Sequence, residues 1–288
     1  MAERRIIMTN KKYKLLENDT IQMGNGATLY RIEALTDFGL VKTGDKGGYI
    51  EKEKNLSQYD NAWVSGNAYV YSNAQVYGSS WVDGDARIGG NTQVSGNARV
   101  YGNAQVYGNA WISNNASIYG DAQVFGNACV YGDATIYGQA QVYGDSDIYE
   151  HARVYEQAVI NGDVRIHENA QVYGDAHISG NARVGDYALI YGDAQVSGLA
   201  LVYSDACISG SKSIVTVHPV GPHDDTFTAY PNKTGGIIVS QMSFFGQGLD
   251  ETLSTLEPRI RKEFEGNPDG DEYKKVIELI KLKLQDVK

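Results

Sequence analysis

The sequence predicts an all-β solenoid, a left-handed parallel β-helix of about eight 18-residue coils, with a small β cap at its N-terminus and an α+β cap at its C-terminus. Three observations predict this fold. Residues 61 to 210 divide into 25 six-residue repeats without an insertion. The fourth residue is Val or Ile in all 25 repeats, and the second is Ala in 21 of them. Proline is absent from this stretch, as a continuously paired parallel ladder requires.

The repeat also predicts the shape of each coil. The sixth residue is Gly in 18 repeats and the first is Asn or Asp in 19, and these residue types tolerate the bent, sometimes left-handed backbone of a tight corner. A corner every six residues, with the second and fourth residues pointing inward, closes a triangle of three repeats. Positions 18 apart therefore stack at the strand spacing of ~4.8 Å, and the repeats build a rod of roughly 40 Å.

The chain divides into three regions. Residues 1–60 are expected to form a β cap with strands at 29–35 and 48–51, residues 61–210 the solenoid, and residues 211–288 a hairpin followed by two helices. Caps are needed because an end coil exposes unpaired backbone and an open apolar core. Asp250 is expected to cap the first helix. The second helix carries an apolar stripe that packs against its own cap or a partner chain: Tyr273, Val276 or Ile277, Ile280 and Leu284.

Charge and composition exclude several classes of protein. The chain has 25 Lys and Arg against 35 Asp and Glu, and residues 61–210 contain 14 acidic residues, 5 Arg and no Lys. A basic surface for nucleic acid is therefore absent. No apolar run is long enough to span a bilayer and no signal segment is evident, so we expect a cytoplasmic protein without a membrane partner. Cys129 and Cys207 fall on different faces and are expected to be unpaired.

The repeats resemble those of a known superfamily. An aliphatic residue followed four positions later by a small one, as in Val64 and Ala68 or Val100 and Ala104, resembles the hexapeptide-repeat superfamily. With LYRIEALTDFGLVKTGDKGGYIE before the repeats and VGPHDDTFTAY after them, nearly the whole chain resembles bacterial, often prophage-encoded members that are named acyltransferases or polymer-forming proteins by fold analogy. The resemblance implies a homo-oligomer, with a trimer favoured, and acetyl coenzyme A as the cofactor if the chain is an enzyme.

Aromatic residues form columns on the predicted surface. The fifth position of each repeat points outward, and on one face it is Tyr in six successive coils: Tyr101, Tyr119, Tyr137, Tyr155, Tyr173 and Tyr191. A second face carries Tyr107, Phe125 and Tyr143. Stacked aromatics can simply reinforce neighbouring strands, or they can form an exposed apolar patch that binds another subunit, a partner or a ligand. These nine residues are the candidate interface.

Polar residues form a second candidate site. Glu150, Glu168 and Asp186 replace the corner glycine at 18-residue spacing and stack on one corner, close enough to repel one another. A solvated ion network balanced by Arg165 and Arg183 is one explanation. A divalent metal or an acid and base patch with His167 is the other. A separate polar cluster, either a turn or a site, follows the repeats: His223, Asp224 and Asp225.

Two classes of function remain. No loop interrupts the solenoid, and His151, His167 and His177 lack the zinc-ligand spacing of the related carbonic anhydrases, so no catalytic residue, cofactor or metal is assigned. We expect a non-catalytic, prophage-encoded scaffold that binds a protein partner or itself, with inhibition of a host defence protein as one form of that function. DNA mimicry is a minor variant, because the carboxylates are sparser than the phosphates of a duplex. The alternative is an acyltransferase that uses an acyl coenzyme A.

Overall fold

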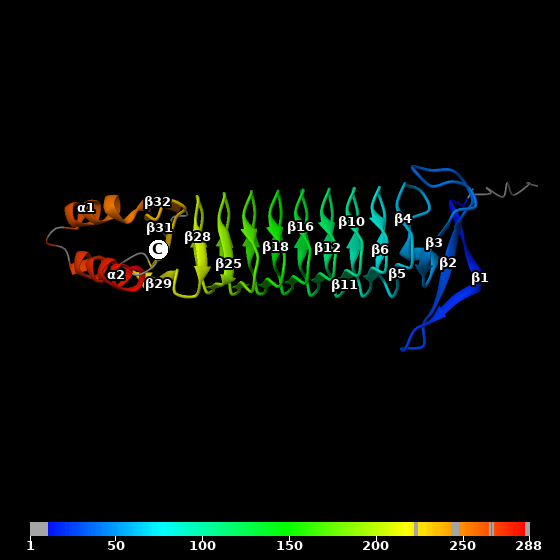
Figure 1. Cartoon of the computed structure of the whole chain (residues 1–288), viewed down its shortest axis with the longest axis horizontal. Coiled ribbons are helices and arrows are strands. Elements are labelled where there is room, and N and C mark those ends of the chain that lie inside the picture. The colour runs from blue at the N-terminus through cyan, green and yellow to red at the C-terminus, as the bar shows by residue number, and fades with distance from the viewer. Residues whose placement is uncertain (1–10, 222–223, 243–247, 265, 267, 286–288) are drawn as a thin grey trace, which may run out of the picture.

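The repeats fold into short strands joined by corners, and the strands of successive coils pair in parallel. The computed structural model describes residues 11–221, 224–242, 248–264, 266 and 268–285. Arg99 and Val100 pair with Ser117 and Ile118 of the next coil, which is a register of 18 residues. The chain is a parallel β-solenoid of about nine turns, with strands at its N-terminal end and an α+β region at its C-terminal end (Figure 1).

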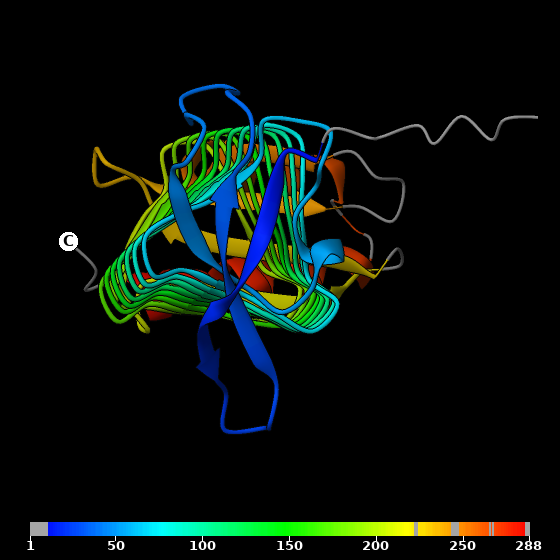
Figure 2. The same cartoon turned by 90° about the vertical axis from the view of Figure 1, so that its right-hand side faces the viewer.

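Three sheets form the sides of the solenoid, and its triangular cross-section is visible end-on (Figure 2). The first sheet, which includes N-terminal strands, contains β1 (Tyr13–Gln22), β2 (Thr28–Ala34), β3 (Lys46–Ile50), β5 (Tyr69–Val70), β8 (Arg87–Ile88), β11 (Gln105–Val106), β14 (Gln123–Val124), β17 (Gln141–Val142), β20 (Val159–Ile160), β23 (His177–Ile178) and β26 (Gln195–Val196). The second, here called the tyrosine face, contains β4 (Trp63–Val64), β7 (Trp81–Val82), β10 (Arg99–Val100), β13 (Ser117–Ile118), β16 (Thr135–Ile136), β19 (Arg153–Val154), β22 (Gln171–Val172), β25 (Leu189–Asp193) and β28 (Cys207–Gly210). The third contains β6 (Gln75–Val76), β9 (Gln93–Val94), β12 (Trp111–Ile112), β15 (Cys129–Val130), β18 (Asp147–Ile148), β21 (Arg165–Ile166), β24 (Arg183–Val184) and β27 (Leu201–Val202).

The core is a single apolar column inside the triangle. The second and fourth residues of the repeats are at most 1 % exposed, as predicted for the inward positions. Three of the four repeats without Ala carry a hydroxyl there, and each hydroxyl donates to a nearby backbone oxygen: Ser80 to Tyr77, Thr92 to Gly89 and Ser146 to Tyr143, at 2.7–2.8 Å. These polar side chains are therefore buried without losing a hydrogen bond.

The corners confirm one half of the prediction and correct the other. The sixth residue of each repeat from Gly66 to Ser204 has a positive φ. This includes seven residues that are not glycine: Ser72, Asn114, Glu150, Glu156, Glu168, Asp186 and Ser204. No Asn or Asp at the first position has a positive φ, so tolerance of left-handed backbone does not explain its frequency there.

The first-position side chains instead form hydrogen-bonded ladders along the corners. Where an Asn is followed by Asn or Asp one coil further on, its amide donates to that residue, as from Asn91 to Asn109 and from Asn109 to Asn127, both at 2.9 Å. The same bond recurs at the other corners, as from Asn97 to Asn115 at 3.0 Å. Asn is frequent at this position because its amide both donates and accepts a hydrogen bond.

The N-terminal strands extend the solenoid before Asn61. β1 and β2 form an antiparallel hairpin, and β3 pairs in parallel with β5, so a partial coil that includes η1 (Glu53–Asn55) precedes the first regular repeat. Tyr13, which is 0 % exposed, packs edge-on against Trp63 at the end of the core. β2 and β3 are the two strands predicted in this region. β1 lacks the strong pattern that would predict it.

The C-terminal region closes the other end of the solenoid. A sheet contains β29 (Val215–Val220), β30 (Asp225–Pro231), β31 (Ile237–Met242) and β32 (Gly248–Thr252), and the helices α1 (Leu253–Glu263) and α2 (Pro268–Leu284) follow it. Thr228 and Tyr230 of β30 accept hydrogen bonds from the backbone N–H groups of Leu201 and Tyr203 in the last coils, at 3.0 and 2.9 Å. Tyr230 is 0 % exposed and belongs to the solenoid core.

Two expectations about the helices are settled. The stripe on α2, from Tyr273 to Leu284, is buried against the C-terminal sheet and α1, so it packs against its own cap. Asp250 does not cap α1, because it lies in β32 and accepts a hydrogen bond from the Ser204 hydroxyl at 2.9 Å, while Thr252 stands at the N-cap. Among the helices of the described residues, none has the length and apolar character needed to cross a membrane. Cys129 and Cys207 are unpaired, as predicted.

Candidate binding surfaces

The six tyrosines of the predicted column stack as a continuous ladder on the tyrosine face. Consecutive ring centroids are 4.8–5.2 Å apart and the ring planes differ by only 2–9°. The spacing of the strands sets this distance, because each ring stands directly above the ring 18 residues earlier. The structure thus confirms the ladder of Tyr101, Tyr119, Tyr137, Tyr155, Tyr173 and Tyr191.

Stacking determines which part of each ring reaches solvent. Each inner ring is covered on both faces by its neighbours, so it presents its edge and its hydroxyl. Tyr101 is 37 % exposed and the other five are half-buried. The hydroxyl of Tyr155 donates to Gln171 at 3.3 Å. Burial and the neighbouring Tyr137 and Tyr173 raise the pKa of Tyr155 to about 12, because an ionised ring would lose hydration and repel its neighbours.

The shorter predicted column on the first sheet also stacks. Tyr107 and Phe125 are 4.9 Å apart, and Phe125 and Tyr143 are 4.6 Å apart. The Tyr143 hydroxyl accepts a hydrogen bond from the Asn161 amide at 2.9 Å, which closes this end of the column. Three rings make a shorter surface than the six-ring ladder.

A third column, which the sequence reasoning did not assemble, lies on the third sheet. Tyr131 stacks on Tyr149 at 5.0 Å, and Tyr149 stacks on His167 at 5.1 Å. Trp111 lies at one end and Tyr203 at the other, with less regular geometry. Burial and Asp147 raise the pKa of Tyr131 to about 12. The 18-residue register applied to every fifth position would have found this column.

The stacked carboxylates are stabilised by backbone N–H groups. Glu150 accepts a hydrogen bond from the N–H of Glu168 at 2.7 Å, Glu168 accepts one from the N–H of Asp186, and Asp186 accepts one from the N–H of Ser204 at 2.7 Å. Elsewhere Glu156 accepts one from the N–H of Gly174 at 2.9 Å. An acid at a corner therefore binds the corner amide of the next coil.

The two arginines do not balance this corner. Arg165 lies 3.9 Å from Asp147 on the flat face, and Arg183 makes no ion pair within the described residues. His167 is the basic residue beside the carboxylates, with its Nδ1 3.7 Å from Glu168. The ligating atoms of Glu150, His167 and Glu168 lie within 4.8 Å of one another, so these three residues could hold a metal ion. One oxygen of each Glu already accepts a backbone hydrogen bond.

The polar cluster after the repeats is divided by the structure. His223 lies outside the described residues. Asp224 has a φ of 52° and its N–H donates to Gly221 at 3.4 Å, as in a turn. Asp225 is 3 % exposed and accepts hydrogen bonds from Gln241 at 3.0 Å and from Tyr273 at 3.2 Å. Asp225 thus links β30, β31 and α2, in a different part of the molecule from the acidic corner.

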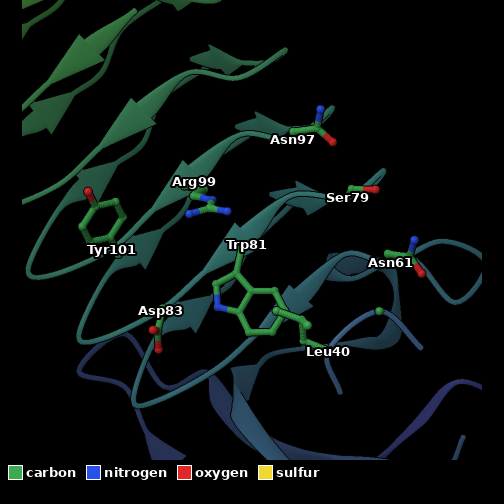
Figure 3. Close-up of a pocket in the computed structure, with 9 residues that line it drawn as sticks. Leu40, Asn61, Ser79, Trp81, Asp83, Asn97, Arg99 and Tyr101 are labelled. Carbon is green, nitrogen blue, oxygen red and sulfur yellow. The ribbon is translucent and has the colours of Figure 1, made fainter. Parts of the chain in front are cut away.

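A groove of about 640 Å³ lies at the N-terminal end of the tyrosine ladder (Figure 3). Tyr101, Trp81 and Leu40 supply its apolar lining, and Asp83 and Arg99 are among its polar residues. Sequence reasoning missed the groove, because Leu40 reaches it from a loop of the N-terminal cap. The available signal was the end of the tyrosine column, where Asp83 occupies the fifth position one coil before Tyr101.

Comparison with known families supports the repeat architecture. Parts of the solenoid match the family model described as YdcK Beta solenoid repeat, at residues 93–107, 104–120, 122–144 and 170–186. These segments cover less than half of the chain. A search of curated proteins finds no match. A β-solenoid repeat fits a scaffold or binding protein.

Proposed function

We propose that this protein is a non-catalytic rigid scaffold whose tyrosine ladder binds protein, either further copies of the chain in a homo-oligomer or a separate partner. The observation that carries the proposal is the set of six parallel rings on one flat face. Tyrosine is enriched at protein interfaces, because it offers a large apolar surface with a polar hydroxyl and few rotatable bonds.

The ladder is already ordered before binding. Each inner ring is held between two others, so little side-chain entropy remains to be lost when a partner covers the ring edges. Arg99 stands beside Tyr101 at the groove end of the ladder, and the third-position residues of the five following coils are mostly uncharged: Ser117, Thr135, Arg153, Gln171 and Leu189. A partner that covers the strip from Tyr119 to Tyr191 would desolvate one cation, Arg153, which favours an interface with an apolar centre and a polar rim.

A pair of substitutions tests this proposal. Tyr137→Ser with Tyr155→Ser removes two rings from the middle of the ladder, and the matched control, Phe125→Ser with Tyr143→Ser, removes two rings from the shorter column. We expect only the first pair to lower the oligomer mass in light scattering or to abolish capture of a partner. An unchanged mass together with unchanged capture, in a folded variant, would refute the interface.

The prophage resemblance extends the proposal to a cytoplasmic inhibitor of a host defence protein. The rigidity of the ladder supports this extension, because a rigid binding surface can block another protein without catalysing a reaction. We expect the chain to restore plaque formation on a host that carries the relevant defence, and the Tyr137→Ser and Tyr155→Ser pair to lose that effect. Plaque numbers that stay equal with and without the chain, across a panel of defence systems, would contradict it.

The alternative function, acyl transfer, has a simple test of its own. A ligand that binds only the folded state raises the melting temperature. We expect acetyl coenzyme A at millimolar concentration to leave the melting temperature unchanged. A rise in that temperature would favour the acyltransferase over the scaffold.

A further inference from the structure

The tyrosine ladder has one end where a ring face is open to a groove. Tyr101 stacks on Tyr119 at 4.8 Å on one side only. One coil earlier the same column position is occupied by Asp83, whose short side chain does not continue the stack. The groove of about 640 Å³ lies at this interruption (Figure 3), and its volume is within the range of about 300–1,000 Å³ usual for ligand sites.

Two aromatic residues and a fixed loop form the apolar part of the groove. Trp81 belongs to β7 and packs partly against the solenoid core. In the view of Figure 3, Leu40 lies beside the Trp81 indole. Leu40 is 87 % exposed, but its loop is held by paired backbone hydrogen bonds of 2.8 and 3.1 Å between Phe38 and Val41. The Phe38 ring packs edge-on against Trp63, with ring centroids 5.4 Å apart, so the loop forms an ordered wall of the groove.

The polar groups of the groove are balanced in charge and in hydrogen-bonding character. Arg99 supplies donors and forms no ion pair within the described part of the chain, while Asp83 supplies acceptors and receives one hydrogen bond, from the Ser65 hydroxyl at 2.8 Å. Asn61 and Ser79 add amide and hydroxyl groups that can donate and accept. One positive and one negative charge cancel locally, although the whole chain carries a net charge of −10.

We propose that this groove binds a neutral oligosaccharide. The C–H face of a sugar ring packs on an aromatic ring, and Trp81 and the open face of Tyr101 offer two such platforms. The hydroxyls of a sugar need both donors and acceptors, which Arg99, Asp83 and Asn61 provide. An apolar ligand would cover these polar groups without forming hydrogen bonds to them, and their desolvation would weaken its binding.

Charged ligands fit the groove less well. A nucleotide or another anion would meet one guanidinium, that of Arg99, beside the carboxylate of Asp83, on a molecule whose net charge is −10. A cation would be attracted by the acidic surface but would meet Arg99 inside the groove. A neutral ligand avoids both penalties, and this is the physical reason for choosing a saccharide.

The proposal is independent of the scaffold function. Protein binding by the ladder uses the edges of the inner rings, whereas sugar binding uses the open face of Tyr101 and the Trp81 indole. Substitutions in the groove should leave oligomer mass unchanged, and substitution of Tyr137 and Tyr155 should leave sugar binding unchanged. Failure of one proposal can therefore be told apart from failure of the other.

The test uses the full chain with cellohexaose, maltohexaose and N-acetylchitohexaose as probes, in calorimetry and in tryptophan fluorescence. We expect at least one probe to bind and change the fluorescence, and Trp81→Ala to weaken that binding by at least about tenfold, the equivalent of one good contact. The matched control is Trp111→Ala, because Trp111 holds the same repeat position on another face and is 45 % exposed. Arg99→Gln, an exposed change that should not disturb folding, is expected to weaken binding as well.

Three results would overturn the sugar site. The first is that none of the three probes binds at millimolar concentration. The second is that a probe binds with unchanged affinity to both Trp81→Ala and Arg99→Gln. The third is that cross-linking places a second copy of the chain or a peptide in the groove, which would assign this surface to protein binding.

Discussion

The carboxylates at the corners lead to a prediction about stability that separates two opposing effects. Glu156 has a positive φ of 58°, and its carboxylate accepts a hydrogen bond from the N–H of Gly174 at 2.9 Å. The left-handed backbone costs a residue with a Cβ about 1–2 kcal/mol, and the hydrogen bond returns part of that cost. Glu156→Ala keeps the strained backbone and loses the bond. Glu156→Gly loses the bond but relieves the strain.

The magnitudes follow from these two terms. Loss of an exposed hydrogen bond costs about 1 kcal/mol, so Glu156→Ala should destabilise the protein by about that amount. Glu156→Gly loses the same hydrogen bond and is destabilised by a further ~0.5–1 kcal/mol because glycine is more flexible in the unfolded chain. The change also removes the backbone strain, which stabilises the folded protein by about 1–2 kcal/mol. Glu156→Gly should therefore lie between about 1 kcal/mol less stable and about 0.5 kcal/mol more stable than the wild type, and Glu156→Ala should be the least stable of the three.

Urea unfolding followed by circular dichroism measures the three free energies. Gly138→Ala is the inverse test on the preceding coil. Gly138 has a φ of 71°, and a Cβ there would lie 2.8 Å from the backbone nitrogen of Glu156, so this change should cost more than Glu156→Ala. A Glu156→Ala variant as stable as wild type would show that the carboxylate bond contributes nothing. A Glu156→Gly variant less stable than Glu156→Ala would show that the backbone is not strained.

Three further outcomes are expected. Folding raises the pKa of Tyr155 from 10.0 to about 12, so the unfolded chain loses this proton first, and stability should be unaffected below pH 10 and fall between pH 10 and 12. The melting temperature of Tyr155→Phe should fall less over this range than that of the wild type. An equal fall would contradict the raised pKa. Ile136→Ala, at a position 0 % exposed, should cost about 2–5 kcal/mol in urea unfolding, and a loss below 1 kcal/mol would mean that the coils collapse around the cavity. Asn109→Ala removes amide bonds to Asn91 and Asn127, both 2.9 Å, and should cost about 1–2 kcal/mol by the same assay, whereas an unchanged stability would make the amide ladder incidental.

The regularity of the repeat explains how much of the fold could be predicted. Once Val100 and Val82 are assigned to the same position of consecutive coils, every other residue between Asn61 and Gly210 has a fixed neighbour 18 residues away. The stacking of Tyr137 on Tyr155 at 4.8 Å follows from that register alone. The predicted aromatic columns were correct because each of them lies on one face of the solenoid.

Contacts between a side chain and a backbone group, or with an irregular loop, could not be predicted from the register in the same way. The register brings Glu150 and Glu168 together, but it does not reveal that the backbone N–H of Glu168 donates a hydrogen bond to the Glu150 carboxylate at 2.7 Å. The close spacing of the carboxylates suggested that arginine side chains neutralise them, whereas backbone N–H groups are their hydrogen-bond donors. The position of Leu40 beside Trp81 depends on the fold of an irregular loop, for which the sequence carries no period (Figure 3).

In a solenoid this regular, a departure from the repeat at the outward fifth position costs less stability than one in the core, because the second and fourth residues carry the core. Such departures are therefore free to serve binding. Replacement of Tyr by Asp83 at the end of the ladder leaves the Tyr101 face uncovered and opens space beside Trp81. A variant that restores the ladder, Asp83→Tyr, should extend the stack by one ring, preserve the fold and fill the groove. If it also abolishes oligosaccharide binding without altering oligomer mass, the interruption of the ladder is what creates the site; continued binding would place the sugar elsewhere.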